Sequence, residues 1–218
     1  MATIKRKLKA EKPLWVVDFD HTLFDSNRFI NDLGLRLESK WNIPLATYMK
    51  AKHTVQEHDI YTFERHFRAI AQSLNMSLPM LMKEVNAFSK KMANYIYPDA
   101  ALFLKEAKKR GDIILLSHGN PLHQRKKIKL TGIGKFAKKV IIADTKLEKG
   151  EWLKKFAKKS NMIIFVNDDP GETRQIFTIA EPPWKTFLVE RPNARYFSIP
   201  KDESYMVVRD LTTIFSLL

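Results

Sequence analysis

Residues 14–25 read LWVVDFDHTLFD, and this stretch decides the fold. Its first four residues are apolar with no polar alternation, which is typical of a short strand buried on both faces, as in a parallel sheet. Asp18 and Asp20 follow directly. Residues two apart on a strand point to the same side, so we expect both carboxylates to project together from the carboxyl end of this strand.

Three more apolar runs have the same character, and each also leads into polar residues. They read IILL at 113–116 before Ser117, VIIA at 140–143 before Asp144, and MIIFV at 162–166 before Asn167-Asp168-Asp169. Because each run is short and lacks alternation, each is predicted to be a buried strand.

Helical patterns separate these runs, at 99–110, 121–130 and 151–159. Later in the chain, FLV at 187–189 and MVV at 206–208 are short strand candidates, and residues 210–218 are predicted to form a terminal helix. Strands that alternate with helices predict an α/β fold, with a Rossmann-like core on a doubly wound parallel sheet. Ligands of such sheets bind outside the carboxyl ends of the strands, where the polar residues lie.

Residues 26–95 differ from the rest because they carry amphipathic helical patterns and no convincing strand. We therefore expect an all-helical module inserted after the first strand. The predicted division is a core of residues 1–25 and 96–218 that carries the site, and a helical domain of residues 26–95.

Composition excludes several classes of protein. The 218 residues are 44% hydrophobic, which suits a packed core, and they contain no cysteine, which excludes disulfides, thiolate nucleophiles and cysteine-bound zinc. The basic stretch at 1–11 leads into no long apolar segment, and no apolar run reaches the roughly 18 residues that span a bilayer. We expect a cytoplasmic protein with no membrane partner.

Charge is the unusual part of the composition. The formal net charge is +14, and residues 105–159 hold 17 basic and 5 acidic residues. Such an excess favours anionic partners such as phosphates or nucleic acid. No recognised nucleic-acid motif accompanies it, and stacking aromatic residues are not interleaved with these lysines in the sequence.

Asp18 and Asp20 form the first candidate site. Close carboxylates repel, so such a pair needs a cation or a shared proton, and Mg²⁺ prefers oxygen ligands of this kind. The same pair also fits a turn after a buried strand, or the Asp-x-Asp metal site of glycosyltransferases.

Three further clusters follow at strand ends or helix starts. Ser117, with His118 and Gly119, offers a hydroxyl and main-chain N–H groups to an anion, although Ser117 or Asn120 equally suits a helix cap. Lys149 lies before a helix predicted to begin near residue 151, where it can reach a phosphate, and Lys146 competes for that role. Asp168, Asp169 and Glu172 are candidate Mg²⁺ ligands, or one aspartate caps the helix that Pro170 begins.

In this order and spacing, over about 150 residues from 14 to 172, the clusters resemble the motifs of the haloacid dehalogenase-like (HAD) superfamily. The four motifs here read WVVDFDHTLFD, IILLSHGN, EKGEW and IIFVNDDPGE. The resemblance is to the phosphatase branch with an inserted helical (C1-type) cap, which matches residues 26–95.

The resemblance implies a role for each matching residue. Asp18 would be the nucleophile that becomes a phosphoaspartate, and Asp20 the acid and base, fixed by Thr22. Ser117 and Lys149 would hold the phosphoryl oxygens. Asp168 would bind Mg²⁺ with the Asp18 carboxylate and the Asp20 main-chain carbonyl, and Asp169 or Glu172 would contribute. Cap residues Lys52, Arg65 and His66 would read the leaving group, or belong to a solvated helix face.

Asp20 also points to a subclass, because haloacid dehalogenases proper lack an acid there and phosphonate hydrolases of the superfamily typically have alanine. The expected function is a Mg²⁺-dependent phosphatase of a small phosphorylated metabolite. The alternatives are a nucleic-acid-binding protein, a polynucleotide or nucleotide phosphatase that uses the basic surface, and a phosphomutase of the same superfamily.

Overall fold

The computed structural model describes residues 12–58, 60–179, 184–192 and 202–218, so the basic stretch at 1–11 lies outside the described residues. Six strands form one parallel sheet in the order β3-β2-β1-β4-β5-β6. The strands are β1 (Leu14–Val17), β2 (Asp112–His118), β3 (Lys139–Ala143), β4 (Ile163–Asn167), β5 (Lys185–Val189) and β6 (Met206–Val208). The predicted doubly wound α/β fold is confirmed.

The register of the sheet brings the polar strand ends together. Val17 at the end of β1 lies between Leu115 of β2 and Val166 of β4. The chain winds outward from β1 in both directions, which opens a crevice at the carboxyl ends of these strands. Asp18 follows β1 at this crevice.

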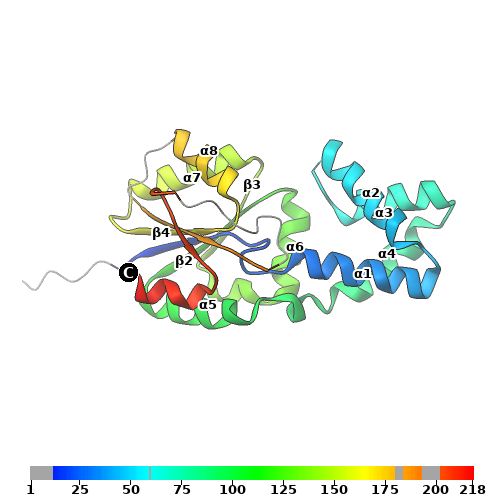
Figure 1. Cartoon of the computed structure of the whole chain (residues 1–218), viewed down its shortest axis with the longest axis horizontal. Coiled ribbons are helices and arrows are strands. Elements are labelled where there is room, and N and C mark those ends of the chain that lie inside the picture. The colour runs from blue at the N-terminus through cyan, green and yellow to red at the C-terminus, as the bar shows by residue number, and fades with distance from the viewer. Residues whose placement is uncertain (1–11, 59, 180–183, 193–201) are drawn as a thin grey trace, which may run out of the picture.

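Helices cover both faces of the sheet (Figure 1). One face carries α5 (Pro98–Arg110) and the 3₁₀ helix η3 (Leu211–Ser216), and the other carries α7 (Lys146–Ala157) and α8 (Pro170–Ile179). Trp15 of β1 packs with Phe103 of α5, whereas Val16 belongs to the cluster on the α7 and α8 side. Because both faces of β1 are covered, its sequence is apolar throughout.

The insertion is helical, as predicted. It contains α1 (Ser26–Trp41), α2 (Leu45–His58), α3 (Phe63–Leu74), α4 (Leu78–Ser89) and the 3₁₀ helix η1 (Met92–Tyr95), and these helices extend from one end of the sheet (Figure 1). The chain enters and leaves the insertion side by side. The Asp25 N–H donates to the Tyr95 carbonyl (2.8 Å), and the Tyr97 N–H donates to the Leu23 carbonyl (3.0 Å).

Two predicted helices differ from the structure. Helix α7 begins at Lys146, more than a turn before residue 151, because Thr145 and Glu148 cap it. The Glu148 N–H donates to Thr145 Oγ1 (3.1 Å), and Glu148 accepts from the Asp144 N–H (2.7 Å). The terminal segment forms the short 3₁₀ helix η3 in place of a helix over 210–218. Within the described ranges, no helix combines the length and apolar character needed to cross a membrane.

Candidate active site

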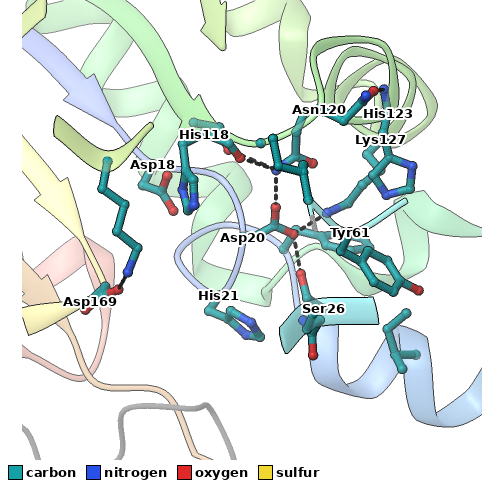
Figure 2. Close-up of a pocket in the computed structure, with 18 of the residues that line it drawn as sticks. Asp18, Asp20, His21, Ser26, Tyr61, His118, Asn120, His123, Lys127 and Asp169 are labelled. Carbon is teal, nitrogen blue, oxygen red and sulfur yellow. Dashed lines mark hydrogen bonds and ion pairs between the residues drawn. The ribbon is translucent and has the colours of Figure 1, made fainter. Parts of the chain in front are cut away.

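A cavity of about 700 Å³ lies between the carboxyl ends of β1, β2 and β4 and the first helices of the insertion (Figure 2). Predicted residues of the first, second and fourth motifs line it, while residues of α1 and α2 and of the loop before α3 line the other side. The predicted residues that line it are Asp18, Asp20, Ser117, His118, Gly119, Lys146, Asp168, Asp169 and Glu172.

Lys149 lies beneath the cavity and holds two of its carboxylates. Its Nζ is 2.8 Å from Asp18 Oδ1 and also contacts Glu172 Oε1, and the side chain is fully buried. Burial opposes the charged form, but the two carboxylates outweigh it and raise the pKa of Lys149. Burial is also the main reason that the pKa of Asp18 rises to about 6, against the lowering effect of Lys149.

Lys146 and Asp169 form a separate pair. Lys146 Nζ lies 2.6 Å from Asp169 Oδ2, and Asp169 Oδ1 accepts the Glu172 N–H (2.9 Å), which caps the start of α8. Asp169 therefore performs the capping role that the sequence left open between two aspartates. Both lysines reach the site, but only Lys149 contacts Asp18.

Thr22 binds a different residue from the one that the resemblance implies. Its buried hydroxyl donates to Asp168 Oδ1 (3.2 Å), so it fixes the fourth motif and not Asp20. Among the described residues, no basic side chain forms an ion pair with Asp168. Burial, with the charge of Asp18 next in importance, raises the pKa of Asp168 well above its usual range.

Asp20 is held by three side chains that the sequence reading missed (Figure 2). Lys127 and the Ser26 hydroxyl both contact Asp20 Oδ1, and Gln124 Nε2 donates to Oδ2 (2.6 Å). Burial alone would raise the pKa of Asp20, but the charge of Lys127 and these hydrogen bonds hold it well below its usual range. The second carboxylate is thus an ionised acceptor.

One feature of the sequence could have indicated these partners of Asp20: polar residues that recur on one side of α6 (Pro121–Thr131). Gln124, Lys127 and Thr131 recur at helical spacing and are buried with Ile128. The apolar pattern of this helix is weak, so its buried face is identified only by asking which polar residues share a side. Gln124 Nε2 also donates to Ser117 Oγ (3.2 Å), which joins the first and second motifs.

Ser117 lines the cavity and does not cap the helix that follows β2. Asn120 caps α6 by accepting the His123 N–H (3.0 Å), so Ser117 is not the cap. Gly119 has φ +124°, a conformation that side chains disfavour, and its N–H donates to the Ala143 carbonyl (3.1 Å). His118 lines the cavity with Nδ1 at 3.7 Å from Glu172 Oε2.

The three predicted specificity residues fall in different places. Lys52 of α2 lines the cavity. Arg65 donates to the Ile60 carbonyl (2.7 Å) and does not line it. His66 is fully buried inside the helical insertion, between Tyr61 Oη (2.9 Å from Nδ1) and the Tyr48 carbonyl (2.8 Å from Nε2), and is therefore a packing residue here.

The carboxylates suit a hard divalent cation. Asp18 and Asp168 are buried oxygen donors: burial raises the pKa of each, and the charge of Asp18 further raises the pKa of Asp168. In the part of the chain that the structure describes, no three His, Asp or Glu side chains are grouped to hold a metal ion. Mg²⁺ commonly binds through one or two carboxylates, and water and substrate oxygens complete its coordination. This donor set fits that pattern.

Comparison with known proteins supports the fold. No family model matches the sequence, and no curated protein sequence matches it. A protein described as a haloacid dehalogenase-like hydrolase, from Burkholderia xenovorans LB400, is similar in structure, with a TM-score of 0.74 at 17% identity over 95% of this chain and 96% of that one.

Two further structures are similar at lower scores. One is YfnB from Bacillus subtilis, described as a HAD hydrolase and bound to magnesium (TM-score 0.63, 16% identity, 95% and 99% of the two chains). The other is L-2-haloacid dehalogenase from Xanthobacter autotrophicus with chloropropionic acid covalently bound (0.63, 14%, 95% and 98%). The chain therefore has the fold of haloacid dehalogenase-like hydrolases.

Proposed function

We propose that the protein is a Mg²⁺-dependent phosphatase that hydrolyses a small phosphate monoester through a phosphoaspartate on Asp18. The observation that carries this proposal is the second carboxylate, Asp20, which lines the same cavity as Asp18 and is fixed by Lys127, Gln124 and Ser26. A carboxylate placed beside a nucleophilic carboxylate can move the proton that an oxygen leaving group requires.

The alternative reaction of this fold is dehalogenation, since one similar structure is a haloacid dehalogenase. A halide leaves as a weakly basic anion and needs no proton, so an acid beside the nucleophile has no use in that reaction. An ester oxygen leaves as a strongly basic alkoxide and does need one. Asp20 therefore favours phosphate esters over haloacids.

In the first step, an Asp18 carboxylate oxygen attacks phosphorus and the bond from phosphorus to the ester oxygen breaks. The leaving oxygen takes a proton from the Asp20 carboxyl group. In the free protein Lys127 holds Asp20 ionised, so the ion pair with Lys127 must first break and Asp20 must take up a proton from solvent, which it then gives to the leaving oxygen. Ser117 lines the same cavity, and its hydroxyl would hold a phosphoryl oxygen.

In the second step, the Asp20 carboxylate accepts a proton from water, and the resulting hydroxide attacks phosphorus. The bond from phosphorus to Asp18 breaks, which releases phosphate and restores the carboxylate. The ionised state that Lys127 maintains is the one this step uses. Asp18 and Asp168 would hold Mg²⁺, which supplies neutralisation of the phosphoryl charge when it is bound.

Release of inorganic phosphate from a panel of phosphate monoesters, with and without Mg²⁺, tests the proposal. We expect Mg²⁺-dependent turnover that Asp18→Asn abolishes. Chloride release from 2-chloropropionate, measured in parallel, separates the two reactions of this fold. Chloride release without phosphate release from any ester would replace the phosphatase assignment with a dehalogenase.

A second candidate function is polyanion binding, and one observation favours it. Trp152 of α7 lies between two lysines distant in sequence: its ring centroid is 5.2 Å from Lys139 Nζ and 4.7 Å from Lys155 Nζ. Trp152 stands between Lys149 and Lys154 in the sequence, so the expectation that no aromatic residue is interleaved with these lysines was wrong. Of the 17 basic residues in 105–159, all except Lys127, Lys146 and Lys149 are exposed. Cations beside an aromatic ring suit single-stranded nucleic acid.

Binding of a labelled single-stranded DNA 20-mer across a salt series tests this candidate. The double variant Lys139→Gln with Lys155→Gln should reduce the slope of log affinity against log salt by about 1.4, because each lysine that contacts a phosphate of a single strand contributes about 0.7. The matched control removes two exposed lysines elsewhere, Lys83 of α4 and Lys90 directly after that helix. Equal losses in both doubles would show that only net charge matters.

A further inference from the structure

His21 has a backbone conformation that histidine rarely adopts. Three non-glycine residues of the described chain have positive φ: His21 at 60°, and Asn42 and Asn75 at 51° each. The two asparagines are helix C-caps, where the left-handed conformation has a structural purpose. His21 caps no described helix, and a histidine there is less favourable than a glycine.

The His21 ring does not hold its own loop together. Its side chain makes no hydrogen bond with any described residue, and its Nδ1 is buried without a partner. The backbone fixes the turn: the His21 N–H donates to the Phe24 carbonyl (2.8 Å), and Arg191 Nη2 donates to the Thr22 carbonyl (2.9 Å). A glycine would make the same turn with the same backbone bonds.

The ring faces the cavity beside Asp20 (Figure 2). A hydrogen on the buried Nδ1 would be an unsatisfied donor, which is more costly than an unused lone pair, so the ring proton belongs on Nε2. Nε2 is not among the buried, unpartnered atoms. The accessible edge of His21 is therefore an unused N–H donor that lines the cavity.

We propose that His21 Nε2–H donates a hydrogen bond to an oxygen on the leaving group, and that it selects phosphate esters of hydroxylated alcohols such as polyols or sugars. This inference rests on the proposed phosphatase function. Asp20 serves the ester oxygen in that function, so a donor on the next residue lies close to the first carbons of the leaving group. Three polar side chains of the insertion, Asn27, Gln56 and Glu57, line the same cavity.

Glycerol 1-phosphate and propyl phosphate form a matched pair of probes, since their leaving groups differ only in hydroxyls. We expect native protein to favour glycerol 1-phosphate in kcat/KM. His21→Gly should reduce that preference about 3- to 10-fold, the usual range for one neutral hydrogen bond, and leave turnover of propyl phosphate within about twofold. His21→Asn tolerates the backbone conformation with a shorter polar side chain and should fall between the two.

Binding measurements test the role of His21 independently of the proposed phosphatase function. Calorimetry of both esters with Asp18→Asn, alone and combined with His21→Gly, measures the same preference without turnover. Loss of the binding preference in the variant that lacks His21 supports the inference, whether or not native protein releases phosphate. Absence of phosphate release would contradict only the proposed phosphatase function. An unchanged preference in both binding and turnover would overturn the role of His21.

Thermal unfolding checks that the loss is not structural. Asn75→Gly makes the same exchange to glycine in the left-handed region, outside the cavity-lining residues, and it calibrates the effect of glycine alone. We expect His21→Gly to lower the Tm by no more than Asn75→Gly does. A clearly larger loss of Tm would show that the ring stabilises the fold, against the inference.

Discussion

Lys127 of α6 and Asp20 of the loop after β1 form an ion pair, although 107 positions separate them in the chain. Lys127 Nζ also lies 5.2 Å and 5.4 Å from the ring centroids of Phe19 and Phe24. The ammonium group is thus fixed on one side by a carboxylate and on the other by two aromatic rings. This arrangement gives the second carboxylate of the site a single orientation.

Replacing Lys127 should disturb that orientation. We expect Lys127→Gln to lower kcat by roughly tenfold, with a smaller change in KM, because Asp20 acts on the reacting atoms and its misplacement slows proton transfer. The neighbouring Lys126 bonds Asn86 at the surface (2.8 Å), so Lys126→Gln is a matched control and should retain native kcat. Steady-state phosphate release measures both, and equal rates for all three proteins would contradict the role of Lys127.

The two candidate phosphate lysines, Lys149 and Lys146, should differ in effect. Lys149→Met leaves the carboxylates of Asp18 and Glu172 buried without their cation, and we expect kcat/KM to fall by at least about 100-fold. Lys146 is partly exposed and pairs with Asp169, so Lys146→Met should cost less than about tenfold. The reverse order would assign the phosphate to Lys146. Circular dichroism establishes that both variants are folded before rates are compared.

A buried ion pair supports the loop that carries Thr22. Arg191 Nη1 lies 2.8 Å from Asp99 Oδ2, and its Nη2 donates to the Thr22 carbonyl. Arg191→Met leaves Asp99 buried without its partner and should lower the free energy of unfolding by about 3 kcal/mol. Arg68 and Glu64 of α3 form an exposed ion pair (2.6 Å), so Arg68→Met should change it by less than about 1 kcal/mol.

Urea unfolding of both arginine variants at pH 7 makes this comparison. We expect Arg191→Met to lose more stability than Arg68→Met. Equal losses would mean that the buried pair contributes no more than the exposed one.

The buried side chain of His66 should make the folding stability of the protein sensitive to acid. Burial, with a smaller opposing effect of the hydrogen bond to Tyr48, lowers the pKa of His66 from 6.5 to about 4. Between these pH values the unfolded chain binds a proton and the folded chain does not. Stability is therefore complete above pH 6.5 and falls as pH decreases towards 4, by about 3 kcal/mol.

Urea unfolding at several pH values between 7 and 4 measures this slope. His66→Gln removes the titrating group, so the free energy of unfolding should depend less steeply on pH. It should also be lower than that of native protein at pH 7. His123, whose pKa falls to about 3 mainly through burial, adds a similar slope in both proteins and so does not affect their difference. Parallel curves for native protein and variant would contradict the assignment to His66.

The strands and the acidic residues could be predicted because their signals are local. An apolar run such as LWVV is visible in the sequence, and the spacing of Asp18 and Asp20 fixes their placement near one strand end. The first, second and fourth motifs line the cavity because parallel strands place their carboxyl ends at one edge, and Lys149 of the third motif contacts Asp18 there.

The partners of these acids could not be predicted, because their contacts join distant segments. Nothing near Asp20 in sequence indicates Lys127, and α6 has too weak an apolar pattern to show its buried side. Thr22 lies two residues from Asp20 yet binds Asp168, since the turn after Asp20 directs its side chain elsewhere. The start of α7 was placed late because the cap formed by Thr145 and Glu148 was overlooked.

The paired backbone segments at Leu23–Asp25 and 95–97 have a consequence for how this fold can change. Phe24 and Ile96 form an antiparallel bridge, so the 71 residues between them start and finish at one point of the α/β core. A deletion or replacement of the whole helical segment would leave two neighbouring chain ends that a short turn can join. Substrate preference can therefore diversify by exchange of one contiguous gene segment, while the carboxylates and their lysines stay in place.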